Sequence, residues 1–310
     1  MTLTAHQQKL LDAATAIHLD SASAKDAAFL ARQFIQATLP HRDPKADTWS
    51  RKNGNFALGL QAGFNHLTGQ SYGLPYGTIP RLVLFWITTE ALRTKQRRIE
   101  LGDTLAEFMR EVGLSPDTGG GKRSDAKRLH EQMRRLFQAR ISFIQANLQD
   151  TRGEATLNME IAPRTVLWWD VRKPEQGSLW ESWIELGESF FEAITSAPIP
   201  VDTRALRALK RSPLTLDLYA LCCYESYRVQ KTRKARFLAW RSLMVQLGAT
   251  YHGKRAQNDF QKECIKAIRK IQAVMPSLKL EIIEGGFTIL SDTTTAIPQA
   301  KTRDSLPPTQ

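Results

Sequence analysis

One pattern of hydrophobic and polar positions occurs twice, in the same order, between residues 80 and 290. Each copy begins with a proline followed by apolar residues at helical spacing, and a short apolar helix comes next, at 105–109 and at 242–247. A Gly-Lys-Arg tripeptide then opens a long amphipathic helix, at Gly121–Arg123 and again at Gly253–Arg255. The pattern therefore predicts three helices in each copy.

Corresponding residues of the two copies are separated by a nearly constant number of positions along the chain. They lie 132 to 134 residues apart in three pairs, which are Pro80 and Pro213, Gly121 and Gly253, and Gln138 and Gln272. Three landmarks in register, within segments of the same helical pattern, indicate an internal duplication.

Each long helix is followed by two short segments in which hydrophobic and polar residues alternate. Segments 141–148 and 156–161 flank a polar turn, and segments 278–283 and 287–290 flank Glu284–Gly286, a turn suited to positive φ. Three helices followed by a β-hairpin make a winged helix. We therefore expect an α+β fold with two tandem winged-helix domains related by internal duplication.

The chain divides into four predicted regions. They are an N-terminal helical segment and linker at 1–54, a first winged-helix domain at 55–170, a second at 171–291, and a disordered tail at 292–310. In the first region, Phe29 to Ile35 show helical spacing, and the polar composition from His41 to Asn55 indicates a loop. The tail contains too few apolar residues to pack.

Four tryptophans lie between the two copies, at Trp168, Trp169, Trp180 and Trp183. They belong either to a base-stacking platform or to extra strands that fill the core between the domains. We expect the second arrangement.

The net charge of the chain is the first indication of its function. Its 43 Lys and Arg against 31 Asp and Glu give a net charge of +12. Such an excess favours a polyanionic partner, and the position of the charges decides whether that partner is nucleic acid.

The first long helix has an apolar stripe that includes Leu129, Met133 and Leu136, and a cationic side opposite it. A helix of this kind at the recognition position of a winged helix fits the major groove. We predict DNA contacts from six of its basic residues, which are Lys122, Arg123, Lys127, Arg128, Arg134 and Arg135. The N-terminal ones are placed to reach base edges and Arg134 to reach phosphate, and Arg123 is the best candidate for reading sequence.

The second long helix repeats this design, with Phe260, Cys264, Ile268 and Ile271 inward. Its predicted DNA contacts are Lys254, Arg255, Lys262, Lys266 and Arg269. Arg152, at the tip of the first hairpin, either enters a minor groove or contacts phosphate, or it is an ordinary exposed turn residue.

The sequence offers no convincing catalytic or metal site. The stretch 118–124 is only partly similar to a phosphate-binding loop, because Pro116 replaces its first glycine and Arg123 replaces the residue that would hold magnesium. The six histidines form no two-His cluster of the kind that a metal-dependent nicking enzyme needs. We expect no enzymatic activity, no metal and no cofactor.

Three cysteines are too few for a disulfide framework, so Cys222, Cys223 and Cys264 are expected to be small core residues in a reducing compartment. No apolar run approaches the roughly 20 residues that a membrane helix needs. We expect a cytoplasmic protein with no membrane contact.

Residues 72–91 (YGLPYGTIPRLVLFWITTEA) and 99–110 (IELGDTLAEFMR) strongly resemble the signature of plasmid RepA-type replication initiators. The similarity continues through 118–122 and 132–137, and less sharply from 212–219 to about residue 290. The resemblance implies a protein that binds direct repeats (iterons) at a plasmid origin, helps to open the DNA and recruits the host replicative helicase. It also implies autorepression by a homodimer. No individual DNA contact is carried over from the family.

Three functions remain open from the residues alone: a replication initiator, a winged-helix transcriptional repressor and a DNA-cleaving replication enzyme. The duplicated unit supports the first two equally, and only the resemblance separates them. The enzyme would need metal ligands and a poised tyrosine, which the sequence does not offer.

Overall fold

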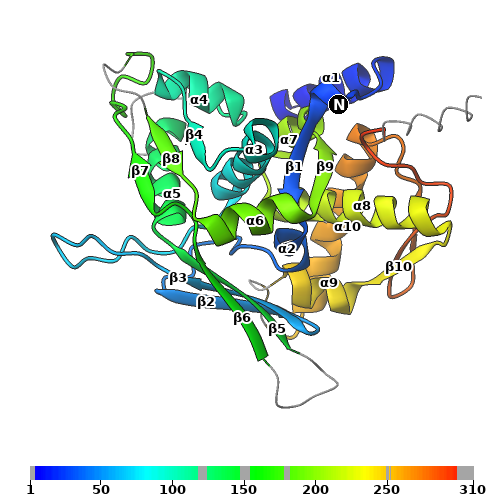
Figure 1. Cartoon of the computed structure of the whole chain (residues 1–310). Helices are drawn as coiled ribbons and strands as arrows, with labels where there is room; N and C mark the ends of the chain where they lie inside the picture. Colours follow the sequence, from blue (N-terminus) through cyan, green and yellow to red (C-terminus); the bar gives the residue numbers. More distant parts are fainter. Residues whose placement is uncertain are drawn as a thin grey trace, which may run out of the picture.

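The computed structural model describes residues 4–117, 124–146, 154–177, 182–248, 251 and 253–298. Within them the chain is a mixed α+β protein with ten α-helices and four antiparallel sheets (Figure 1). The N-terminal part contains α1 (Ala5–Leu19), a 3-10 turn (Ala24–Asp26), β1 (Ala27–Ala31), α2 (Arg32–Gln36), β2 (Thr48–Asn53) and β3 (Phe56–Gln61).

The first copy of the repeated pattern forms the predicted elements. They are α3 (Thr78–Thr94), α4 (Leu105–Glu111), α5 (Asp125–Phe137), β5 (Arg140–Ala146) and β6 (Glu154–Glu160), and a strand that the pattern does not predict, β4 (Arg98–Glu100), lies between α3 and α4. A capping box of Thr104 and Glu107 begins α4, and the Ser124 side chain caps α5. The hairpin β5–β6 is confirmed, and it extends a sheet of order β2-β3-β5-β6.

The second copy contains α8 (Pro213–Thr232), β10 (Arg236–Ala239), α9 (Trp240–Leu247), α10 (Ala256–Val274), β11 (Leu280–Ile283) and β12 (Gly286–Ile289). Pro213 lies in the first turn of α8, where its fixed φ suits the helix. The predicted hairpin β11–β12 is present, and β10 completes a sheet of order β10-β12-β11.

The two copies share helix packing but differ in their sheets. In each, the long helix packs on the first and the second helix of its copy, α5 on α3 and α4, and α10 on α8 and α9. In the second copy, β10 pairs with the hairpin strand β12. In the first, β4 pairs instead with β8 (Trp183–Glu185), which also pairs with β7 (Arg164–Val166).

The segment joining the two copies contributes three further elements. They are α6 (Glu188–Ser196), β9 (Pro198–Asp202) and α7 (Thr203–Leu209). Strand β9 pairs along its whole length with β1, from Ala27 opposite Asp202 to Ala31 opposite Pro198.

This pairing corrects two expectations about the N-terminal region. The helix predicted from Phe29 to Ile35 is strand β1 followed by the single turn of α2, because β1 gains a partner from a distant part of the chain. The loop predicted from His41 to Asn55 contains β2, which forms a hairpin with β3. The boundary expected after residue 54 falls in the turn of that hairpin, and the division into domains stays a prediction.

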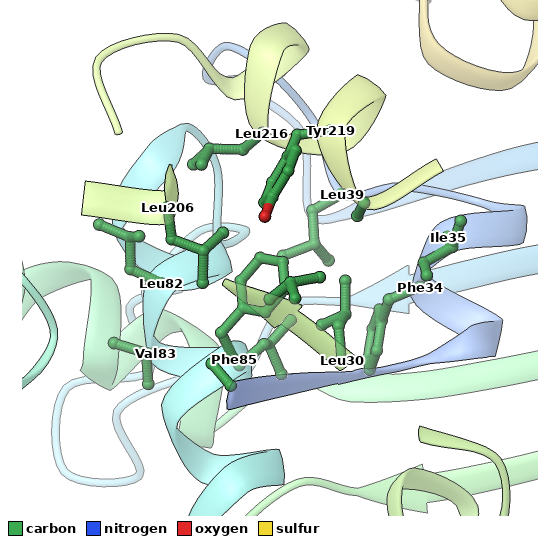
Figure 2. Packing of buried hydrophobic residues seen from close by; sticks show 14 of the residues in the cluster. Leu30, Phe34, Ile35, Leu39, Leu82, Val83, Phe85, Leu206, Leu216 and Tyr219 are labelled. Carbon is green, nitrogen blue, oxygen red and sulfur yellow. The ribbon is translucent and has the colours of Figure 1, made fainter. Parts of the chain in front are cut away.

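One continuous hydrophobic core joins the N-terminal region to both copies. Figure 2 shows side chains from β1, α2, α3, α7 and α8 packed together, with Tyr219 of α8 facing Leu206 and Phe85. The Tyr219 hydroxyl accepts a hydrogen bond from the Asp202 backbone N–H at 3.0 Å, which ties α8 to the end of β9. Helix α1 packs on α7 and α10.

The expected disorder of the tail does not hold for residues 292–298. Thr293 is buried, and its hydroxyl accepts from the Lys279 N–H at 3.0 Å and donates to the Lys279 carbonyl at 2.8 Å. Ile297 is buried as well. Side chain to backbone pairing therefore fixes a segment whose composition alone indicates no structure, and residues 299–310 lie outside the described part.

Candidate nucleic-acid interface

Helix α10 presents a cationic outer face. Its buried side includes Phe260, Cys264, Ile268 and Ile271, as predicted, and these residues pack toward α8 and α9. The predicted contact residues are all exposed: Lys262, Lys266 and Arg269 lie on the opposite side of α10, and Lys254 and Arg255 directly precede its first residue. Lys266 forms an exposed i,i+3 ion pair with Glu263 at 2.7 Å, which contributes little and leaves the lysine accessible.

The first turn of α10 also exposes two amide side chains that a search for cations alone overlooks. Gln257 and Asn258 are exposed beside Arg255. Asn258 precedes Lys262 by one turn, and so it shares the cationic face. An Asn or Gln amide can pair bidentately with adenine, and the signal in the sequence is an amide at the start of a long amphipathic helix.

Helix α5 carries fewer free cations than the sequence suggests. Arg134 is exposed, and its guanidinium lies over the Tyr72 ring at 5.5 Å from the centroid. Arg128 is exposed and pairs with Asp125 at 3.0 Å, while Lys127 is half-buried. Burial, together with the charge of Arg134, lowers the pKa of His130 on the same helix.

Arg135 has an internal position, which differs from its expected place on the cationic face. Its side chain is only 15% exposed, and it pairs with Glu131 at 2.6 Å and with Asp43 at 3.4 Å. It also donates to the Leu74 carbonyl at 3.3 Å and lies over the Tyr76 ring. The loop that follows β3 covers this side of α5, so Arg135 holds the loop and is not presented to a ligand.

Three other predicted contact residues lie outside the described residues. They are Lys122, Arg123 and Arg152. Their predicted roles in base reading and in the first hairpin tip stay predictions.

The tryptophans between the copies do not form a common stacking surface among the described residues. Trp169 is buried against Phe108, with ring centroids 5.3 Å apart, and Arg98 covers the Trp183 ring at 4.4 Å. Trp168 is 56% exposed, and Trp180 lies outside the described part. Trp169 agrees with the expected core role, whereas the exposed Trp168 does not.

The described residues include no candidate metal site. None of their His, Cys, Asp or Glu side chains form a group of three or more that could hold a metal ion. All three cysteines are buried, and burial raises the pKa of Cys223 and of Cys264 to about 12. These thiols are therefore protonated core residues. No helix in the described ranges is both long and apolar enough to cross a membrane.

Two solved structures are similar to this chain at low sequence identity. Selenomethionine derivatives of domains 2 and 3 of RctB are 12% identical, with 83% of this chain and 94% of that chain covered and a TM-score of 0.49. Another structure of RctB domains 2–3 is 11% identical, with 83% and 95% covered and a TM-score of 0.47. No curated protein sequence matches the chain.

A family model described as plasmid-encoded RepA protein matches residues 74–242, which is more than half of the chain. The match runs from the loop before α3 through α8 and β10 into α9. It thus includes all of α5, and the resemblance seen in the sequence motifs is confirmed. The chain belongs to the family of plasmid-encoded RepA proteins.

Proposed function

We propose that this protein is a plasmid replication initiator that binds direct repeats in duplex DNA at its origin, through α5 and α10. Membership of the RepA family supports the link to a plasmid. The observation that carries the proposal is the outer face of α10 and its N-cap, where Arg255, Asn258, Lys262 and Arg269 are exposed along about four turns opposite a fully buried stripe. A face of this composition supplies both phosphate contacts and base-edge contacts.

The two copies act in this proposal as two winged helices. The second copy supports it best, since α8, β10, α9, α10, β11 and β12 follow the winged-helix order and the sheet has the order β10-β12-β11. The first copy keeps the helix order, but β8 takes the place of the hairpin beside β4. The proposal therefore assigns DNA binding to the helix packing that the copies share rather than to identical sheets.

The proposal assigns the protein no catalytic step and no cofactor. In this proposal the protein helps to open the origin by binding DNA there, and it recruits the host helicase through protein–protein contacts. A homodimer that represses its own promoter fits the same DNA contacts.

The test is binding of the full chain to a duplex that carries direct repeats from the encoding plasmid, with a scrambled duplex as competitor. We expect a footprint on each repeat and loss of that footprint in Arg255→Ala and Arg269→Ala. Arg164→Ala is the matched control, because Arg164 is an exposed arginine of β7, away from α10.

Plasmid maintenance gives the second readout. The same α10 variants should fail to support replication of a plasmid that carries only the origin, whereas the control should support it. Binding to repeats without any effect on replication would identify a repressor instead. Equal binding of all variants would show that α10 is not the DNA-reading helix.

A further inference from the structure

The segment after β3 forms a narrow projecting hairpin, residues Gly63–Gly73, which we name the 63–73 arm. It is the light-blue hairpin that extends from the body beside β3 (Figure 1). Phe64 and Ser71 form a bridge, the Tyr72 N–H donates to the Gly63 carbonyl at 2.9 Å, and the Asn65 N–H donates to the Gln70 carbonyl at 2.8 Å. Backbone pairing therefore holds the arm in shape.

The base of the arm is fixed to the C-terminal end of α5. Gly63 lies so close to α5 that a Cβ there would be 2.2 Å from the Gln138 carbonyl oxygen. Tyr72 lies beneath the guanidinium of Arg134, and the Ser71 hydroxyl donates to Asp47 at 2.6 Å. The base of the arm and the C-terminal part of α5 consequently form one continuous surface.

An apolar side chain is held out at the tip of this arm. Leu67 is 96% exposed, and its N–H donates to the Asn65 side-chain oxygen at 2.9 Å, which fixes its backbone. Phe64 is half-exposed and packs against the His66 ring at 4.5 Å between centroids. The arm thus presents two exposed apolar side chains, Leu67 and Phe64, on a backbone that hydrogen bonds hold in place, and a partner can contact them without a change in the fold.

The absence of carboxylates from the arm indicates the chemical class of its partner. Residues 62–73 include no Asp or Glu, and their polar side chains are hydrogen-bonding ones, including Asn65, Thr68 and Gln70. The arm begins beside Arg134, an exposed arginine of α5. The one carboxylate that the arm contacts through Ser71 is Asp47, at its base, so the tip itself carries no negative charge. An uncharged tip that adjoins an exposed arginine fits a polyanion, and a minor groove about 6 Å wide admits a narrow tip.

We propose that the 63–73 arm enters the DNA minor groove next to the major groove that α5 occupies, and that Leu67 inserts between base pairs and kinks the duplex. Arg134, stacked on Tyr72, then lies at the phosphate strand between the two grooves. Apolar wedges of this kind partly unstack a base step and bend DNA toward the major groove. Pyrimidine–purine steps unstack most easily, so the wedge favours such a step.

This inference rests on the proposed binding of duplex DNA by α5. The experiment uses the full chain and a repeat-containing duplex labelled at both ends, and it measures bending by energy transfer and minor-groove contact by hydroxyl-radical cleavage. The variants are Leu67→Ala and Leu67→Ser. The matched control is Leu19→Ala, because Leu19 is another leucine that is 84% exposed, at the end of α1.

We expect the wild-type protein and Leu19→Ala to bend the duplex and to protect a minor groove beside the α5 site. Both Leu67 variants should lose the bend and that protection while the slope of log K against log salt stays the same, because no cation is removed. A wild-type bend and footprint in the Leu67 variants would overturn the wedge and leave the proposed function intact. Failure of the wild-type protein to bind any duplex would overturn both.

Discussion

Arg81 of α3 and Asp217 of α8 form a buried two-point ion pair that joins the first helices of the two copies. The Arg81 Nε donates to Asp217 Oδ1 at 2.7 Å and its Nη2 donates to Oδ2 at 2.8 Å, with side-chain exposures of 4% and 8%. The same guanidinium donates to the carbonyls of Leu39, Pro40 and Gly77, and His41 lies 2.8 Å from Asp217 Oδ2. Arg81 therefore links both copies and the segment before β2.

This ion pair bears on DNA binding because α5 packs on α3 and α10 packs on α8. A planar guanidinium held by five hydrogen bonds permits little rotation of one first helix against the other. We expect it to fix the spacing between α5 and α10, the two helices proposed to bind DNA.

Removal of one partner of this pair should be strongly destabilising. Asp217→Ala leaves the Arg81 charge buried without a counter-ion, and we expect a loss of about 3–5 kcal/mol in the free energy of unfolding. Denaturant titration measures it. The double variant Arg81→Met with Asp217→Leu should lose much less than the sum of the single variants Arg81→Met and Asp217→Leu. Additive losses would show that the two side chains are not coupled.

Stability should fall at mildly acidic pH because of His41 and His130. Burial lowers the pKa of both below the ordinary 6.5, and the charges of Arg81 and Arg134 respectively add to this effect. Below pH 6.5 the unfolded chain binds more protons than the folded one, so the free energy of unfolding decreases as pH falls. We expect His41→Gln and His130→Gln each to flatten this dependence between pH 6.5 and about 5, above the range where carboxyl groups titrate. An unchanged slope in both variants would contradict the assignment.

Protonation of Asp217 should lower the stability of the protein in a second, more acidic pH range. Burial raises the pKa of this carboxyl, but the charge of Arg81 and the hydrogen bonds from His41 and Arg81 outweigh burial and bring the pKa to about 2. The resulting stability is fully present above the ordinary pKa of 3.8 and is lost as pH falls toward 2. Acid unfolding followed by circular dichroism should begin at higher pH in Asp217→Asn than in the wild-type protein.

Local patterns in the sequence predict the helices and hairpins of the two copies well. Hydrophobic periodicity and turn-forming residues determine such elements over a few neighbouring positions. They do not predict β1, whose strand conformation depends on β9, or the pairing of Arg81 with Asp217 across 136 positions. Arg135 has the helical position of a surface cation, and only the loop that packs over it makes it internal. The predicted DNA contacts do not include Asn258, because a pattern of basic residues does not indicate an uncharged amide.

Gly286 should be intolerant of a side chain. A Cβ there would be 2.2 Å from the Leu238 carbonyl oxygen and 2.7 Å from the Phe237 ring, so β12 would have to move away from β10. We expect Gly286→Ala to cost about 1–3 kcal/mol in the free energy of unfolding. Gly177→Ala is the matched control, because a Cβ at Gly177 meets nothing within 4 Å. Equal stability of the two variants in thermal unfolding would show that the sheet accommodates the methyl group.

Arg134 and Arg135 are neighbours in the sequence and should behave differently. Arg135→Ala removes contacts to Asp43, Glu131 and the Leu74 carbonyl, and we expect a loss of about 1–3 kcal/mol in stability. Arg134→Ala should change stability by no more than about 0.5 kcal/mol and should weaken DNA binding. Thermal unfolding and a binding titration on the same preparations separate the two effects. The reverse result would place Arg135, and not Arg134, at the DNA.

On α10, base reading and phosphate neutralisation should fall on different residues. Asn258 lies in the first turn of the helix, where recognition helices reach base edges, and Arg269 lies about three turns further along the same exposed face. Asn258→Ala should cost about 1–3 kcal/mol of binding on the cognate repeat and much less on a scrambled duplex, with the salt dependence unchanged, because a bidentate contact to adenine is lost. Arg269→Ala should weaken binding to both duplexes alike and reduce the slope of log K against log salt by about one unit, because one fewer counter-ion is released. Salt titrations of each variant on both duplexes give these quantities, with Arg164→Ala as control. If Asn258→Ala weakened binding to both duplexes equally, the first turn of α10 would not read sequence. If Arg269→Ala left the slope of log K against log salt unchanged, that end of the helix would not contact phosphate.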